Sequence, residues 1–110
     1  MNNDRLEQLF LFQKDSPNDP FILFAIAKEY EKRQEQDKAL GYYKQLVLEH
    51  ADYVGTYYHL GKLYEQLHQV SDAFFTYKKG MEVAREAGDQ HALNELAGAK
   101  LMLGDDDDFE

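Results

Sequence analysis

The sequence of 110 residues predicts an all-α protein made of tandem antiparallel helix hairpins, with a further helix flanking them at each end. Three observations support this prediction. The chain matches itself, without a gap, when it is shifted by 34 positions. Within the matching segments, apolar residues recur at intervals of three and four, which is the spacing of one face of an α-helix. Small residues also recur at corresponding positions, so the two segments are expected to fold alike and to pack closely.

The self-match includes apolar, small and charged positions. The matched pairs are Leu23–Tyr57, Ile26–Leu60, Ala27–Gly61, Lys28–Lys62, Tyr30–Tyr64, Glu31–Glu65, Ala39–Ala73 and Tyr43–Tyr77. At the small positions, Ala27 and Ala39 in one segment and Gly61 and Ala73 in the next, a larger side chain would push paired helices apart at a cost of about 1–3 kcal/mol. These four residues are therefore expected at helix crossings. Glycine inside a helix costs about 1 kcal/mol relative to alanine, so Gly61 and also Gly80 are expected to have a packing reason.

The first expected helix spans about residues 4–14. Its apolar residues are Leu6, Leu9, Phe10 and Phe12. Asp19 and Pro20 then begin a second helix, because Asp is a favoured N-cap and Pro is favoured at the first helical position. Its inward face holds Leu23, Ile26, Ala27 and Tyr30. The partner helix of this hairpin is expected over about residues 37–49, with Ala39, Tyr43, Leu46 and Val47 inward.

The second hairpin and a last helix follow. Asp52 is expected to cap its first helix, and Gly88 to end its second, because glycine is typical of helix C-termini. The inward residues are Tyr57, Leu60, Gly61 and Tyr64 in the first helix, and Ala73, Phe74, Tyr77, Gly80, Met81 and Ala84 in the second. A final helix is expected over about residues 90–103, before Gly104. Its apolar residues are Leu93, Leu96, Ala97, Leu101 and Leu103.

This arrangement resembles the tetratricopeptide repeat, a helix–turn–helix unit of about 34 residues with the pattern W-x2-L-G-x2-Y, then A-x3-F and P. The two repeats span about residues 20–53 and 54–87. The matching residues are Leu23, Ile26, Ala27, Tyr30, Ala39 and Tyr43 in the first, and Tyr57, Leu60, Gly61, Tyr64, Ala73 and Tyr77 in the second. Ala51 and Arg85 stand where the closing proline would be. The resemblance implies an α-solenoid of stacked hairpins, in which helix 90–103 caps the array because its own signature match fails.

We expect residues 1–104 to form one domain and residues 105–110 to form an acidic tail. The net charge is −9, and the tail sequence DDDDFE carries five of the acidic residues. Charge blocks of this kind are usually solvated, so a frayed end is expected. Two alternatives stay open: a tail that docks into the Lys28 and Lys62 surface of a neighbouring molecule, and a loose cation site, although no calcium-hand pattern is present.

The composition argues against several classes of function. An anionic chain without a basic stripe is not expected to bind nucleic acid. There is no cysteine and no pair of histidines four residues apart, so no metal site or cofactor is expected. No phosphate loop or nucleophile elbow points to an enzyme. No apolar run could span a membrane, and the N-terminus lacks the features of a signal peptide, so a cytoplasmic location is expected.

The resemblance implies that the first helix of each pair lines a concave face that binds a protein or peptide. The predicted peptide-binding residues are Phe21, Phe24, Lys28, Tyr58, His59, Lys62 and Glu65. Aromatic anchors beside cations suit an extended or helical peptide that carries an acidic group. Alternatively, Phe21 and Phe24 pack on the N-terminal helix, Tyr58 packs on the last helix, and the lysines only offset nearby glutamates. The second candidate function is structural self-association, as a homodimer or as a small subunit of a larger assembly.

Overall fold

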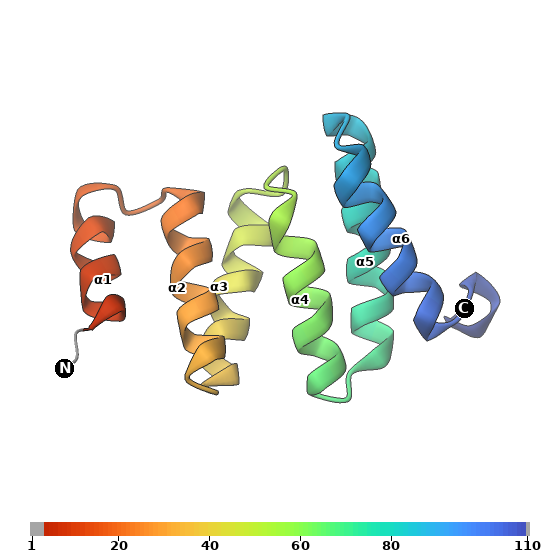
Figure 1. The fold of residues 1–110 in the computed structure, drawn as a ribbon, viewed down its shortest axis with the longest axis horizontal. Helices are drawn as coiled ribbons and strands as arrows, with labels where there is room; N and C mark the ends of the chain where they lie inside the picture. Colours follow the sequence, from red (N-terminus) through yellow and green to blue (C-terminus); the bar gives the residue numbers. More distant parts are fainter. Residues whose placement is uncertain (1–3, 110) are drawn as a thin grey trace. The chain divides into compact units, whose positions relative to one another are not determined.

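The computed structural model describes residues 4–109, which form six α-helices and one short 3-10 helix (Figure 1). Met1, Asn2, Asn3 and Glu110 lie outside the described residues. The chain divides into two compact units, Met1–His50 and Ala51–Glu110. Each unit contains one of the expected hairpins and one flanking helix. The predicted all-α fold of tandem helix hairpins with flanking helices is therefore confirmed.

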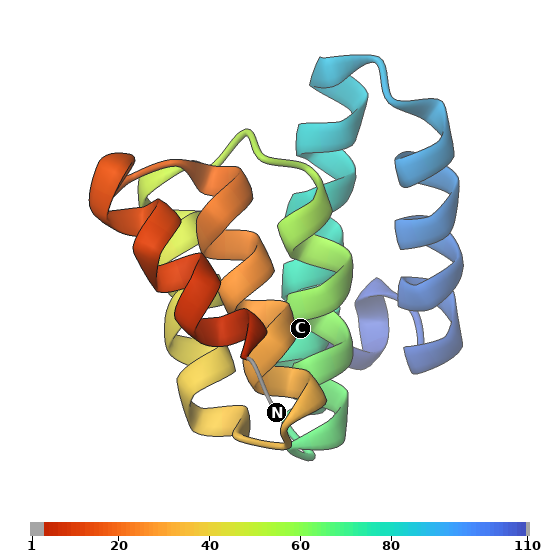
Figure 2. The ribbon, with the colours of Figure 1, turned by 60° about the vertical axis from the view of Figure 1, so that its left-hand side comes forward.

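The first unit contains α1 (Arg5–Asp15), α2 (Pro20–Lys32) and α3 (Gln36–Glu49). Helices α2 and α3 run antiparallel as a hairpin, and α1 lies against α2 (Figures 1 and 2). Its fully buried apolar residues are Leu23, Ile26, Ala27, Ala39, Tyr43 and Leu46. Arg33, at the end of α2, binds Asp4 at the start of α1, with 2.6 Å between Nη2 and Oδ1. The same guanidinium binds Glu29 through Nε at 3.2 Å, so one arginine ties the flanking helix to the hairpin.

The second unit contains α4 (Gly55–Gln66), α5 (Val70–Ala87), α6 (Gln90–Leu103) and the 3-10 helix η1 (Asp106–Phe109). Helices α4 and α5 form the second hairpin, and α6 packs on α5 and also contacts α4 (Figure 2). Its fully buried apolar residues are Tyr57, Leu63, Ala73, Phe74, Tyr77, Ala84 and Leu96. Of the apolar residues expected in helix 90–103, Leu96 is buried and Leu101 is 72 % exposed. The reason is that α6 has helices on one side only, and Leu101 lies outside that contact.

Most helix ends follow from local chemistry. The carboxylate of Asp19 accepts a hydrogen bond from the Phe21 N–H at 2.9 Å, as expected of an N-cap before proline. Gly88 ends α5 in the left-handed conformation, with φ 72°. The predicted cap at Asp52 is wrong: α4 begins three residues later at Gly55, after Val54, without a side-chain cap. Gln34 and His68, one repeat apart, both adopt left-handed backbone at the turn inside each hairpin, with φ of 62° and 61°.

The small residues lie at helix contacts, as predicted. Ala27, Ala39 and Ala73 have no exposed surface. A Cβ placed on Gly61 would lie 2.2 Å from the Cε1 of Tyr77, and one placed on Gly80 would lie 2.4 Å from the Cβ of Tyr57. Both distances are far inside van der Waals contact. Glycine at these two positions therefore lets α4 and α5 approach each other.

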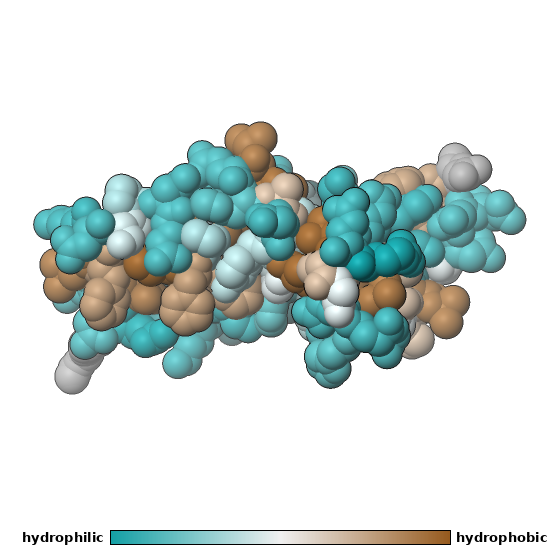
Figure 3. All heavy atoms as spheres, turned by 90° about the horizontal axis from the view of Figure 1, so that it is seen from above, coloured by the Kyte–Doolittle hydropathy of each residue, from teal (hydrophilic) through white to brown (hydrophobic). Residues whose placement is uncertain are grey.

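Several large apolar side chains remain exposed. They are Leu11, Phe12, Phe21 and Leu48 in the first unit, and Val70, Phe75, Leu101 and Met102 in the second. Figure 3 shows hydrophobic surface at the α1 end of the first unit and at the α6 end of the second, next to hydrophilic side chains. Within residues 4–109, no helix combines the length and the apolar character needed to cross a bilayer.

Candidate functional site

In the first unit, α2 carries Phe24, Lys28 and Glu31 at spacings of four and three residues, which place them along one side of the helix. Phe24 is half-buried, and its ring meets the ring of Tyr43 edge-on, with 6.1 Å between centroids. The hydroxyl of Tyr43 donates a hydrogen bond of 2.5 Å to the carboxylate of Glu31. The hairpin partner α3 therefore holds both the aromatic and the acidic member of this row.

In the second unit, α4 repeats the row with Tyr58, Lys62 and Glu65. The ring of Tyr58 lies 6.4 Å from the ring of Tyr77 on α5. The ammonium group of Lys62 lies 5.5 Å from the centroid of Tyr58 and 3.8 Å from Oε2 of Glu65. The predicted pairing of Lys62 with Glu65 is therefore present. The row presents an aromatic face, a cation and a carboxylate within one helix surface.

We call these two rows the aromatic–lysine surfaces: Phe24, Lys28 and Glu31 in the first unit, and Tyr58, Lys62 and Glu65 in the second. Corresponding positions in the two rows are 34 residues apart in the sequence. Each surface is completed by a tyrosine from the second helix of its own hairpin. The two units therefore present the same kinds of groups in the same local order.

The remaining predicted residues stand beside these rows. His59 neighbours Tyr58, and their rings meet edge-on at 5.7 Å between centroids. Phe21 lies one turn before Phe24 on α2 and is 68 % exposed, so its packing on the N-terminal helix, considered above, is wrong. An exposed phenyl ring is available for contact with another molecule.

The two tyrosines that complete the surfaces, Tyr43 and Tyr77, were predicted only as core residues. Each ring is buried, while each hydroxyl reaches a carboxylate on the first helix. A sequence signal for this second role exists: Glu31 and Tyr43 are 12 residues apart, and so are Glu65 and Tyr77. A repeated pair of an acid and a tyrosine is the kind of pattern that a repeated hydrogen bond leaves.

These contacts change the acidity of the tyrosines. Burial of the ring, followed by the hydrogen bond to Glu31, raises the pKa of Tyr43 well above its ordinary value of 10.0. Burial and the hydrogen bond to Glu65 likewise raise the pKa of Tyr77 well above 10.0. Both phenols therefore keep their protons, and remain hydrogen-bond donors, to a higher pH than an exposed tyrosine does.

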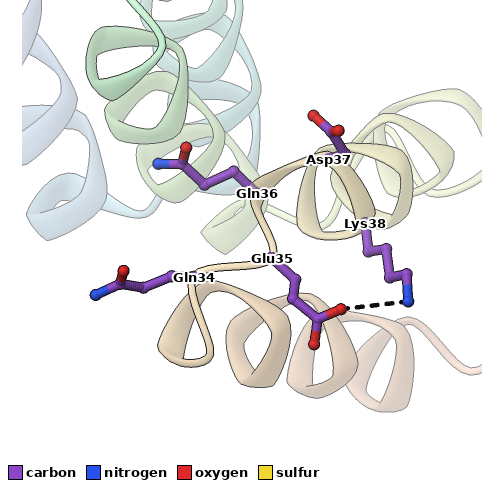
Figure 4. Close-up of a pocket in the computed structure, with 5 residues that line it drawn as sticks. All are labelled: Gln34, Glu35, Gln36, Asp37 and Lys38. Atoms are coloured by element: carbon purple, nitrogen blue, oxygen red, sulfur yellow. Dashed lines mark ion pairs between the residues drawn. The ribbon is translucent and has the colours of Figure 1, made fainter.

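A separate hollow of about 340 Å³ lies at the turn between α2 and α3. It is lined by Gln34, Glu35, Gln36, Asp37 and Lys38. Figure 4 shows the side chains of Gln34 and Gln36 extending to one side and that of Asp37 pointing away from them, while Lys38 turns to Glu35 at 3.2 Å. Binding sites need polar groups that converge on one point, so this hollow is a feature of the turn. Among the residues described, no group of three or more acidic or histidine side chains is placed to hold a metal ion.

Helix hairpins that recur every 34 residues, with small residues at their contacts and the same row of side chains on both first helices, define a helical repeat protein. Two solved structures of a tetratricopeptide repeat domain protein from Salinibacter ruber are similar to this chain. The solution structure is 51 % identical, covers 80 % of this chain and 89 % of its own, and has a TM-score of 0.78. The crystal structure is also 51 % identical, covers 78 % of this chain and 96 % of its own, and has a TM-score of 0.75.

The chain therefore belongs to the tetratricopeptide repeat family, as its signature residues predicted. No family model matches the sequence, and no curated protein matches it significantly. Tetratricopeptide repeat domains are generally protein-interaction modules that bind proteins or peptides, and they are generally non-catalytic.

Proposed function

We propose that this chain is a non-catalytic adaptor that binds a protein or peptide through its aromatic–lysine surfaces. The observation that carries the proposal is the repetition of the same row, an aromatic ring, a lysine and a glutamate, on the first helix of both hairpins. The hairpins need their small and apolar positions and the two tyrosine–glutamate bonds, but they do not need an aromatic ring followed by a lysine at the partly exposed positions of both first helices. The repetition of half-exposed polar groups favours a shared role in contacting a partner.

The chemistry of the rows fits a polypeptide with both apolar and acidic groups. In the second unit, the ring of Tyr58 offers an apolar face and Lys62, whose side chain is 42 % exposed, offers a cation beside it. Tyrosine is a frequent energetic anchor of interfaces, because its ring buries a large area while its hydroxyl stays hydrated. In the first unit, Phe24 corresponds to Tyr58 and Lys28 to Lys62, and Phe21, one turn earlier, adds an exposed ring beside them. His59, Glu65 and Phe24 would line the edges of these contacts.

The experiment is affinity capture from an extract of the native cells, followed by titration of the captured partner. Phe21→Ala with Lys28→Glu removes the ring and reverses the charge in the first unit, and Tyr58→Ala with Lys62→Glu does so in the second. We expect each pair of substitutions to lower the affinity for the partner at least tenfold, which corresponds to about 1.4 kcal/mol of binding free energy. Lys44→Glu, an exposed charge reversal on α3, is the matched control and should change the affinity little.

Self-association is the second candidate function. The exposed apolar side chains of Leu11 and Phe12 on α1 and of Leu101 and Met102 on α6 support it. If copies associate through these helices, sedimentation will show a dimer that Phe12→Ser or Met102→Ser dissociates. A monomer at all concentrations, with partner binding that depends on Lys28 and Lys62, would leave the adaptor as the sole function.

A further inference from the structure

The acidic tail folds back onto its own unit, contrary to the expected frayed end. Residues 106–109 form η1, which lies beside the beginning of α5 and the end of α6 (Figure 2). The ring of Phe109 stacks on the ring of Phe74, with 4.1 Å between centroids and 15° between planes. It also meets the ring of Phe75 edge-on at 6.5 Å. An aromatic side chain therefore anchors a segment that composition alone predicted to be solvated.

Two lysines flank this aromatic stack. Lys100 on α6 lies 4.7 Å from the centroid of Phe74 and 3.2 Å from Oδ1 of Asp106. Lys78 on α5 lies 3.7 Å from Oδ2 of the same carboxylate. We call Phe74, Phe75, Lys78 and Lys100 the tail-binding surface. It offers a ring face for an aromatic residue, as it does for Phe109. It also offers two cations for an acidic residue three positions before that aromatic residue, as it does for Asp106.

The return of the tail depends on Gly104. Its φ of 140° and ψ of −168° are accessible to glycine and strained for other residues. A Cβ at this position would lie 2.7 Å from Oδ2 of Asp108. That same oxygen accepts a hydrogen bond from the Asp105 N–H at 2.9 Å, which closes the turn. The backbone is thus built to bring Asp106 and Phe109 onto the surface together.

We propose that the tail-binding surface recognises an acidic segment of a partner protein that carries an aromatic residue three positions after an aspartate. The chain's own tail is a tethered competitor that occupies the surface until such a segment displaces it. The chemistry of the occupant is given by the tail itself, because its ring and its carboxylate meet a complementary ring and complementary charges.

This surface is separate from the aromatic–lysine surfaces and does not follow from the repeat. The residues that correspond to Phe74 and Phe75 one repeat earlier are Leu40 and Gly41, so the first hairpin has no equivalent. The proposal therefore goes beyond the proposed function and can fail independently of it.

The test is a titration of the full-length chain with a fluorescein-labelled peptide that has the sequence of residues 104–110, followed by fluorescence anisotropy. Phe109→Ala removes the anchor of the tethered tail and should increase the affinity for the peptide at least tenfold over wild type, because a surface occupied nine-tenths of the time binds about tenfold more weakly. Asp106→Asn keeps the ring stack and should increase the affinity less. A peptide in which alanine replaces the phenylalanine should bind at least tenfold more weakly.

Second-site changes locate the peptide. Adding Lys100→Glu to Phe109→Ala should abolish the gain, whereas adding Lys62→Glu should leave it unchanged. The proposal is overturned if Phe109→Ala binds no better than wild type, if neither protein binds the peptide up to about 1 mM, or if Lys62→Glu removes the binding. A wild-type dimer that Phe109→Ala converts to monomer would also overturn it, because the tail would then be exchanged between copies.

Discussion

The phenol of Tyr77 donates a hydrogen bond to the carboxylate of Glu65, and 34 residues earlier Tyr43 makes the same bond to Glu31. Each bond joins the second helix of a hairpin to the first, and each places a carboxylate beside a lysine position. The bond therefore connects the packing of the hairpin to the arrangement of its aromatic–lysine surface. In the second unit, Glu65 also pairs with Lys62, so one carboxylate serves both the fold and the surface.

Removal of the hydroxyl alone should weaken the second hairpin. We expect Tyr77→Phe to lower the free energy of unfolding by about 1–2 kcal/mol, because a hydrogen bond to a charged group is lost. Glu65→Ala should cost about 1–3 kcal/mol, because it leaves the buried phenol unpaired. Urea denaturation measures both. Tyr42→Phe, a half-exposed tyrosine on α3, is the control and should stay within about 0.5 kcal/mol of wild type. If Tyr77→Phe leaves the free energy of unfolding unchanged, the hydrogen bond adds nothing to stability.

The raised pKa values of Tyr43 and Tyr77 predict a loss of stability at alkaline pH. Their stabilising effect is complete below the unfolded pKa of 10.0 and is lost as the pH rises, because the unfolded phenols release protons while the folded phenols keep them. The slope is at most about 1.4 kcal/mol per pH unit for each tyrosine. Urea denaturation between pH 8 and pH 11 should show a decline that begins near pH 10.0 and is shallower in Tyr43→Phe. An identical slope in both proteins would contradict the assignment.

Gly61 tests the close approach of α4 and α5. We expect Gly61→Ala to cost about 1–3 kcal/mol, because the new methyl group would overlap the buried ring of Tyr77. Gly98→Ala on α6 is the matched control, since a Cβ there meets nothing within 4 Å. It should raise stability by up to about 1 kcal/mol through helix propensity. Thermal unfolding distinguishes the two, and a stabilising Gly61→Ala would refute the packing reason.

At Gln34, where the backbone is left-handed, glycine is expected to stabilise the protein, whereas glycine inside a helix destabilises it. A non-glycine residue in this conformation is strained, so Gln34→Gly should raise the free energy of unfolding by about 0.5–1 kcal/mol after the larger unfolded-state entropy of glycine is counted. Lys44→Gly, in the exposed interior of α3, should instead lower it by about 1 kcal/mol. If both substitutions destabilise equally, the turn carries no strain.

The fold could be predicted because each local pattern occurs at the same position in both repeats, so each occurrence supports the other. Ala27 and Gly61 are ambiguous alone, yet their common place in a 34-residue period identifies a helix contact. Errors occurred where local chemistry had no repeat to support it. Asp52 is a good capping residue, but the chain starts α4 only at Gly55.

The candidate site was harder to predict, because it depends on contacts between helices. The rows on α2 and α4 followed from helical spacing. The roles of Tyr43 and Tyr77 depend on which carboxylates their hydroxyls reach on the neighbouring helix. Helical spacing alone does not give these partners. The prediction of a frayed tail was wrong because four aspartates dominate its composition. Composition does not show that a single residue, Phe109, can stack on Phe74 and hold the segment in place.

The central claim is that the aromatic–lysine surfaces are where a partner polypeptide binds. The most direct measurement is photocrosslinking in native extract with a benzophenone amino acid placed at Tyr58, and in a second protein at Leu48, which is 83 % exposed on α3. We predict a discrete adduct from position 58 that Lys62→Glu removes, and none from position 48. Adducts of equal yield from both positions, or from position 48 alone, would contradict the claim.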